Sequence, residues 1–217
     1  MSSFSHLRQF ISLALFGGLI VFTLTAWGQT APPSTARILV VGDSLSSEYG
    51  LTRGTGWVAL LKKALTEARI ESDIVNASIS GDTTSGGATR LKRLLDKHAP
   101  SLVILELGGN DALRGLPLEM TRQNLNTMAT QARESGAKVV VVGMQIPPNY
   151  GREYATGFKE VFETVAKHNK ASLVPFLLEG VAADPKYLQA DNLHPNEVAQ
   201  PQMMRNVLEV VLALLKT

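Results

Sequence analysis

The 217-residue sequence contains no cysteine. This absence excludes disulfide bonds, cysteine-ligated metal sites and a cysteine nucleophile, and a domain of this size folds without such covalent supports. Aromatic residues make up only 6% of the chain, and the basic residues are scattered, with a formal net charge of +2. Nucleic-acid-binding surfaces need a basic stripe, commonly with interleaved aromatic residues, so we expect no nucleic-acid partner.

Long hydrophobic runs are also absent, except at the N-terminus. Residues 10–27 are almost wholly apolar, follow a short segment that has basic but no acidic residues, and precede small residues at a possible cleavage point. This pattern is typical of a secretory signal peptide. It predicts that residues 1–28 are removed and that the protein is exported to the periplasm or secreted, with no stable membrane anchor after processing. The alternative is an uncleaved signal anchor, because the run approaches the length that spans a bilayer.

The remainder of the chain divides into a short linker, residues 29–36, and one domain, residues 37–217. In this domain, short β-branched runs alternate with segments whose apolar residues recur at helical spacing. The predicted strands are residues 37–42, 73–77, 102–107, 138–143 and 172–175, and the predicted helices are residues 56–70, 89–98, 121–134, 154–169 and 196–216.

Strands that alternate with helices of ten or more residues predict βαβ units and a parallel sheet. The fold class is therefore α/β, with helices on both faces of a five-stranded parallel sheet, a three-layer αβα arrangement. In open sheets of this kind, functional sites form just beyond the carboxyl ends of the strands. The loops at these positions are where we expect catalytic residues.

Four polar segments, three of which contain glycine, follow predicted strands or precede the last predicted helix. Each segment alone also fits a turn or a helix cap, because Asp, Ser, Asn and Gly are common in both. Neither the Walker pattern nor a G-x-G-x-x-G pattern is present, which disfavours nucleotide binding. The segments are GDSLS (residues 42–46), SISGDT (78–83), GGND (108–111) and DNLHPN (191–196).

Read together, these segments supply the residues of a serine hydrolase. A serine hydroxyl needs a neighbouring base, usually a neutral histidine that a carboxylate orients. Of the four histidines, one lies in the N-terminal segment and two lie beside a lysine at the ends of predicted helices, where a solvated cation suits the helix dipole. His194 remains as the candidate base, with Asp191 three residues before it as the orienting carboxylate and Ser44 as the nucleophile.

Acyl transfer also needs hydrogen-bond donors directed at the developing oxyanion. The candidates are the backbone N–H groups of Ser44 and Gly81 and the side-chain amide of Asn110. Asp43 is expected to accept hydrogen bonds from loop amides rather than to react, and Trp57 is expected in the core.

The four segments, in this order, resemble those of the SGNH/GDSL hydrolase family, whose four letters are matched here by Ser44, Gly81, Asn110 and His194. The stretches NASISGDT (76–83), ELGGNDALRG (106–115), MQIPPNYGREY (144–154) and DNLHPNEVAQP (191–201) are similar to the bacterial acyl-CoA thioesterase, lysophospholipase and arylesterase group. The resemblance implies a flavodoxin-like fold and hydrolysis of acyl esters and thioesters, namely aryl esters, acyl-CoA and lysophospholipids, without metal or cofactor. The G-x-S-x-G signature of standard α/β-hydrolases is absent around Ser44.

The expected substrate is a small-molecule or lipid acyl ester, and the expected oligomeric state is a monomer or weak dimer. Apolar residues near the predicted strand ends favour an acyl chain over a sugar, although a carbohydrate O-deacetylase shares every catalytic residue. A non-catalytic binding module remains a further alternative, disfavoured because Ser, Gly, Asn and His are all present. The candidate substrate-binding residues are Leu113, Leu116, Ile146, Pro147 and Tyr150, the last of which also fits a surface loop.

Overall fold

The structure, a computed structural model, describes residues 35–216. The expected signal peptide, residues 1–28, and residues 29–34 of the expected linker lie outside the described residues. Within the described range, no helix combines the length and the apolar character needed to cross a membrane.

The centre of the domain is a five-stranded sheet in which every neighbouring pair of strands is parallel. The strand order is β2-β1-β3-β4-β5, so the chain first winds outward from β1 in one direction and then crosses to the other side of β1. This arrangement confirms the predicted parallel sheet, and each predicted strand is present within one residue at either end. The strands are β1 (Ala36–Gly42), β2 (Ser72–Asn76), β3 (Leu102–Glu106), β4 (Lys138–Val142) and β5 (Ser172–Val174).

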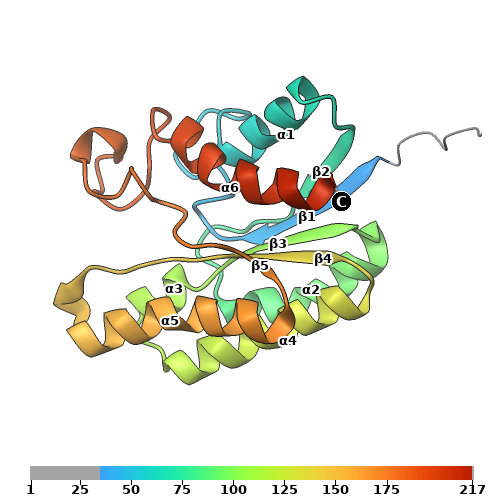
Figure 1. The fold of residues 1–217 in the computed structure, drawn as a ribbon. Helices are drawn as coiled ribbons and strands as arrows, with labels where there is room; N and C mark the ends of the chain where they lie inside the picture. The colour runs from blue at the N-terminus through green and yellow to red at the C-terminus, as the bar shows by residue number, and fades with distance from the viewer. Residues whose placement is uncertain (1–34, 217) are drawn as a thin grey trace, which may run out of the picture. The chain divides into compact units, whose positions relative to one another are not determined.

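Helices cover both faces of the sheet and complete the predicted three-layer αβα fold (Figure 1). On one face lie α1 (Trp57–Glu67) and α6 (Gln200–Leu215), which contact each other. On the other face lie α2 (Thr84–His98), α4 (Leu118–Glu134) and α5 (Arg152–Asn169). Three short elements complete the chain: α3 (Gly109–Leu113), η1 (Pro148–Tyr150) and η2 (Pro185–Tyr187).

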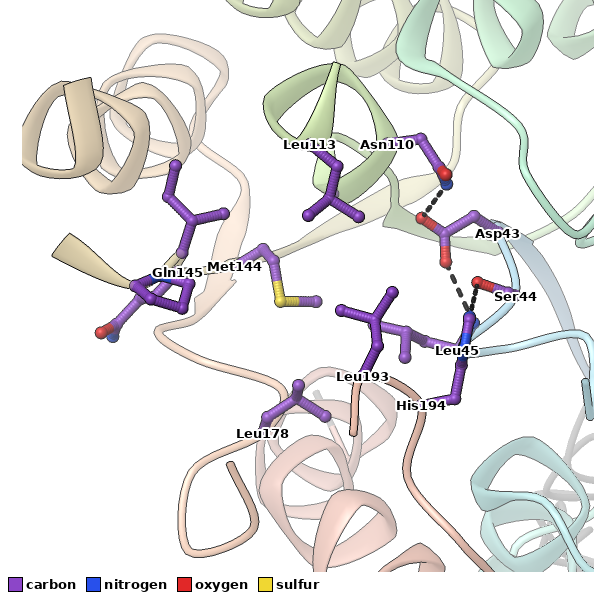
Figure 2. A pocket seen from close by; sticks show the side chains of 13 residues that line it. Asp43, Ser44, Leu45, Asn110, Leu113, Met144, Gln145, Leu178, Leu193 and His194 are labelled. Atoms are coloured by element: carbon purple, nitrogen blue, oxygen red, sulfur yellow. Dashed lines mark hydrogen bonds between the residues drawn. The ribbon is translucent and has the colours of Figure 1, made fainter. Parts of the chain in front are cut away.

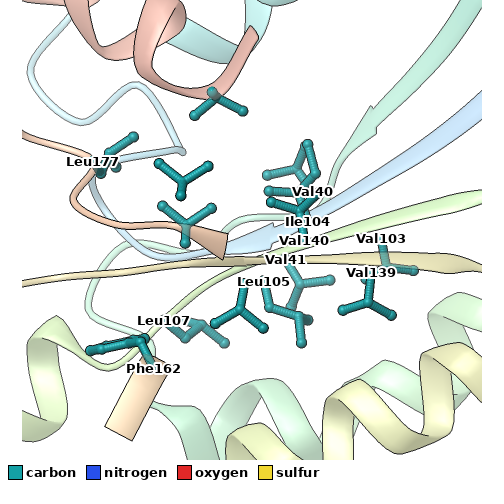
Figure 3. Packing of buried hydrophobic residues seen from close by; sticks show 14 of the residues in the cluster. Val40, Val41, Val103, Ile104, Leu105, Leu107, Val139, Val140, Phe162 and Leu177 are labelled. Carbon is teal, nitrogen blue, oxygen red and sulfur yellow. The ribbon is translucent and has the colours of Figure 1, made fainter. Parts of the chain in front are cut away.

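The core lies between these layers and explains why the strands are nearly continuous runs of Val, Ile and Leu. All five residues of β3 are buried, because helices cover both of its faces. Successive side chains of the central strands point to opposite faces: Val40, Ile104 and Val140 lie on one side of the sheet, and Val41 and Leu105 on the other (Figure 3). The Trp57 side chain is fully buried, which confirms its predicted place in the core.

The two helix starts that differ most from the predictions are those of α2 and α6. Helix α2 begins at Thr84 rather than at residue 89, because the Thr83 hydroxyl caps it by accepting a hydrogen bond from Gly86 N (3.3 Å), and the two glycines of its first turn weaken the helical signal. Helix α6 begins at Gln200 rather than at residue 196, so Pro201 lies in its first turn, where proline is tolerated.

Candidate active site

The four polar segments converge at the carboxyl edge of the sheet. Ser44 lies in the turn directly after β1, Gly81 lies in the loop after β2, and Asn110 lies in the short helix α3 after β3. His194 comes from the loop before α6. Because β1 and β3 are neighbours from which the connections leave in opposite directions, their ends diverge and open a crevice, as is usual for ligand sites in open α/β sheets.

Ser44, His194 and Asp191 form a continuous hydrogen-bonded chain. The Ser44 Oγ lies 2.9 Å from His194 Nε2 (Figure 2). His194 Nδ1 in turn lies 2.7 Å from Asp191 Oδ2. A carboxylate only accepts hydrogen bonds, so Nδ1 carries the proton and Nε2 is left to accept from the serine hydroxyl. The three residues that the sequence proposed as nucleophile, base and orienting acid therefore have the geometry that this chemistry needs.

The turn around Asp191 keeps that carboxyl group ionised. Its Oδ1 accepts hydrogen bonds from the backbone N–H groups of Leu193 (2.9 Å) and His194 (3.0 Å). These backbone hydrogen bonds, with that from the His194 side chain, lower the pKa of Asp191 to about 2. Asn192, in the left-handed region at φ 57°, closes the turn. Asp191 therefore carries its negative charge throughout the neutral pH range.

The three candidate oxyanion donors differ in what they bind. Among residues 35–216, the backbone N–H groups of Ser44 and Gly81 donate to no acceptor. The Asn110 side-chain amide, by contrast, donates both of its hydrogens, to Asp43 Oδ2 and to the Asp82 carbonyl oxygen, each at 3.0 Å. Two donors are thus free in this structure, and the third is held by two acceptors.

Two buried acids lie beneath Ser44. Asp43 Oδ1 accepts from Leu45 N (3.0 Å), and Glu106 Oε2 accepts from the Ser46 hydroxyl (2.5 Å) and from Asp43 N (3.3 Å). Burial raises the pKa of Asp43 to about 6, and burial together with the nearby Asp43 charge raises the pKa of Glu106 well above its usual value. Asp43 binds a loop amide as predicted. Sequence reasoning missed Glu106, although an acid inside the apolar run LVILEL is an available signal.

A cavity of about 130 Å³ opens beside Ser44 and His194 (Figure 2). Three of the five residues proposed to bind substrate line this cavity: Leu113, Ile146 and Pro147. The other two lie outside its lining: the Leu116 carbonyl oxygen accepts a hydrogen bond from the Tyr154 hydroxyl (2.7 Å), and Tyr150 is exposed on η1. The remaining apolar lining, not foreseen from the sequence, consists of Leu45, Met144, Leu178 and Leu193.

The described residues contain no group of three or more His, Cys, Asp or Glu side chains placed to hold a metal ion. The chemistry of the site is therefore described through its serine, histidine, amide and carboxyl groups.

Comparison with known proteins places this geometry in a family. Residues 40–200 match the model of the GDSL-like Lipase/Acylhydrolase family. The chain is 48% identical to the protein named "Esterase TesA" from Pseudomonas aeruginosa, over 94% of this chain and 99% of that protein. It is 39% identical to "Thioesterase 1/protease 1/lysophospholipase L1" from Escherichia coli K12, over 76% of this chain and 77% of that protein.

A solved structure agrees with these matches. The crystal structure of TesA superposes with a TM-score of 0.80 at 49% identity, covering 82% of this chain and 99% of that chain. The family model extends from the second half of β1 to the first residue of α6 and includes all four polar segments. The chain belongs to the GDSL-like lipase/acylhydrolase family.

Proposed function

We propose that the protein is a serine esterase and thioesterase that hydrolyses small acyl esters and thioesters through a covalent acyl-enzyme on Ser44. The observation that carries this proposal is the chain from Ser44 through His194 to Asp191, which opens onto a largely apolar cavity. The relatives named esterase and thioesterase support the same reaction class.

In the first half of the reaction, Ser44 Oγ attacks the acyl carbonyl carbon while His194 Nε2 accepts the hydroxyl proton. Asp191, already ionised, stabilises the imidazolium that forms. The tetrahedral intermediate then collapses, and the alcohol or thiol leaves with the proton from His194. In the second half, His194 takes a proton from water as the water oxygen attacks the acyl group on Ser44. The second tetrahedral intermediate then collapses, His194 returns the proton to Ser44 Oγ, and the carboxylic acid is released.

Charge on the tetrahedral oxygen needs donors, and the free N–H groups of Ser44 and Gly81 are the first two in our proposal. Asn110 becomes the third when it exchanges one of its present acceptors, Asp43 Oδ2 or the Asp82 carbonyl oxygen, for the oxyanion. The left-handed conformation of Gly81 (φ 77°) suits a glycine, and the position that a Cβ would take there faces open space, with no other part of the protein within 4 Å.

The cavity indicates which part of the substrate it holds. Its volume of about 130 Å³ is below the roughly 300–1,000 Å³ typical of pockets that enclose a whole drug-sized ligand. In our proposal the cavity receives the acyl chain, and the alcohol or thiol portion remains outside it. A sugar O-deacetylase would place only an acetyl group there, so a substrate series that varies the acyl length separates the two activities.

We also propose that the protein acts outside the cytoplasm, after removal of residues 1–28. The support is the sequence of the N-terminal segment, which lies outside the described residues. Intact-mass analysis of the protein purified from its native host would give the mass of residues 29–217 if this proposal holds, and that of the whole chain if an uncleaved anchor is correct.

Intact-mass analysis after brief exposure to a fluorophosphonate tests the proposed nucleophile. The wild-type protein should gain one adduct and the Ser44→Ala variant none, with circular dichroism confirming that both are folded. Turnover of p-nitrophenyl esters and acyl-CoAs of increasing chain length then defines the substrate. Labelling that persists in Ser44→Ala, or a folded wild-type protein that takes up no label, would refute the assignment.

A further inference from the structure

The nucleophile and the base of the proposed triad lie on two separate loops. We call residues 43–56 the nucleophile loop and residues 188–196 the base loop. Ser44 and His194 are 150 positions apart in the sequence, so their 2.9 Å separation depends on how the two loops are held together. The Ser44–His194 hydrogen bond cannot by itself hold this geometry, because catalysis makes and breaks it.

Gln189 joins the two loops through its side-chain amide. Its Nε2 donates one hydrogen bond across to the Tyr49 carbonyl oxygen in the nucleophile loop (2.9 Å) and a second to the Pro195 carbonyl oxygen beside the base (3.0 Å). Its backbone N–H donates to the His194 carbonyl oxygen (2.7 Å). Both side-chain hydrogens are therefore committed, one to each loop, and the backbone of the same residue holds the base itself.

Tyr49, whose carbonyl oxygen accepts the hydrogen bond from Gln189, also contacts the His194 ring directly. The Tyr49 ring packs against the His194 imidazole, with ring centroids 4.6 Å apart and an interplanar angle of 44°. A ring packed this closely against an imidazole restricts the rotation of the imidazole. The position of the Tyr49 backbone, and hence of its ring, is set by the hydrogen bond from Gln189.

Gly50, next to Tyr49, leaves room for this arrangement. It adopts φ 69°, in the left-handed region, and a Cβ there would collide with the Gln189 side-chain amide. The nucleophile loop therefore presents a bare α-carbon where the Gln189 amide packs. The Gln189 side chain is therefore held against the nucleophile loop by packing on Gly50 as well as by its hydrogen bond to Tyr49.

We propose that Gln189 is a positioning residue that sets the distance and orientation of His194 relative to Ser44, through the Tyr49 carbonyl group and the ring beside it. This inference rests on the proposed function, because it assigns Gln189 to the same triad. Loss of the two amide hydrogen bonds lowers the rate of Ser44 acylation and leaves substrate binding in the apolar cavity intact, since Gln189 does not line that cavity.

The test compares Gln189→Met with Gln202→Met. Methionine keeps the length of the side chain and removes both donors. Gln202 is a matched control, because it is also partly buried and hydrogen-bonded through its side chain, to Asn206 and Arg205, but lies on α6. Because small misplacements of reacting groups cost up to about 100-fold in rate, we expect Gln189→Met to lower kcat and the fluorophosphonate labelling rate roughly 10- to 100-fold. We expect KM to change by less than about twofold.

Gln202→Met should match the wild-type protein in kcat and labelling rate. A Gln189→Met protein that is folded and has wild-type kcat would overturn this inference alone, provided that the wild-type protein is labelled at Ser44. Failure of the wild-type protein to be labelled would instead refute the proposed function. The two failures are therefore distinguishable.

A second pair of variants decides the matter if Gln189→Met does not fold. Tyr49→Ala removes the ring and should lower kcat several-fold at unchanged KM, whereas Tyr49→Phe keeps the ring and should restore the rate. Equal kcat for Tyr49→Ala and the wild-type protein would show that the segment held by Gln189 does not act on His194, and would overturn the inference.

Discussion

The acids on the two sides of Ser44 behave in opposite ways. Asp191, on the outer side, has a side chain that is 41% exposed, and its pKa is lowered to about 2. Asp43 and Glu106, on the inner side, are each only 2% exposed, and the pKa of Asp43 is raised to about 6 while that of Glu106 is raised well above its usual value. The charged form of a carboxyl group is thus favoured on one side of Ser44 and disfavoured on the other.

The difference follows from which interaction dominates at each carboxyl group. Asp191 keeps contact with water and accepts two backbone N–H groups and an imidazole, all of which favour the charged form. Burial dominates at Glu106, and the nearby charge of Asp43 disfavours a second negative charge. The outer acid is placed to support a positive imidazolium, whereas the inner pair anchors loops in a setting that disfavours a second negative charge.

Replacing the outer acid should give the largest effect in this comparison. Asp191→Asn removes the charge that favours the imidazolium and allows the wrong histidine tautomer, so we expect kcat to fall about 1,000- to 10,000-fold. Steady-state kinetics on a p-nitrophenyl ester measures the loss, with urea denaturation as a check on folding. A loss below tenfold would show that water replaces Asp191 at this exposed position.

Asn110 connects the two sides, because it is bound to the inner acid and is the third oxyanion donor in our proposal. Asn110→Ala should lower kcat roughly 100- to 1,000-fold, as expected for one lost oxyanion donor. The same kinetic assay at saturating substrate measures this loss. Wild-type turnover in Asn110→Ala would leave Asn110 only the structural role that its hydrogen bonds to Asp43 and Asp82 already give it.

On the inner side, replacing Glu106 by a neutral group should change the free energy of unfolding only slightly. Glu106→Gln keeps an oxygen that accepts from the Ser46 hydroxyl and Asp43 N, so the free energy of unfolding should change by less than about 1 kcal/mol. Glu106→Ala leaves both donors unsatisfied and creates a cavity, and should cost about 2–4 kcal/mol. Urea denaturation at pH 7 distinguishes the two variants, and equal losses would indicate that Glu106 is ionised.

The smallest effect concerns the pH dependence of stability. The pKa of Asp43 is raised from 3.8 to about 6 on folding, so the folded protein binds more protons than the unfolded chain between these values. Stability should therefore fall as pH rises through this range, by about 1 kcal/mol between pH 5 and 7. Asp43→Asn should remove this slope in urea denaturation at a series of pH values. An unchanged slope would assign it to other groups.

The fold was largely predictable because its strands are short runs of Val, Ile and Leu that only a doubly covered sheet can bury. Helix boundaries were less accessible, since a cap such as that of Thr83 is a side-chain geometry rather than a pattern. The helix α3, with five residues, is too short to show a helical period. It nevertheless carries Asn110.

The candidate site was likewise predictable from the sequence only in part. Ser44, Asp191 and His194 could be put forward because polar residues at strand ends have few other reasons to recur in this order. The residues of the cavity wall could not be predicted in full. The sequence does not show which apolar loop residues, such as Leu178 and Leu193, turn toward the cavity rather than the core. Glu106 was hidden for a related reason, since its place in a buried strand suggested packing and not hydrogen bonding.

The 150 positions between Ser44 and His194 also have a consequence during biosynthesis. At about 5–20 residues per second, the ribosome makes the nucleophile roughly 8–30 seconds before the base. An incomplete chain thus carries a serine with no histidine to activate it. In the proposed mechanism, hydrolytic activity begins only after the loop that carries His194 has been made and has folded against Ser44, so the growing polypeptide is inert toward the acyl esters of its own cell until then.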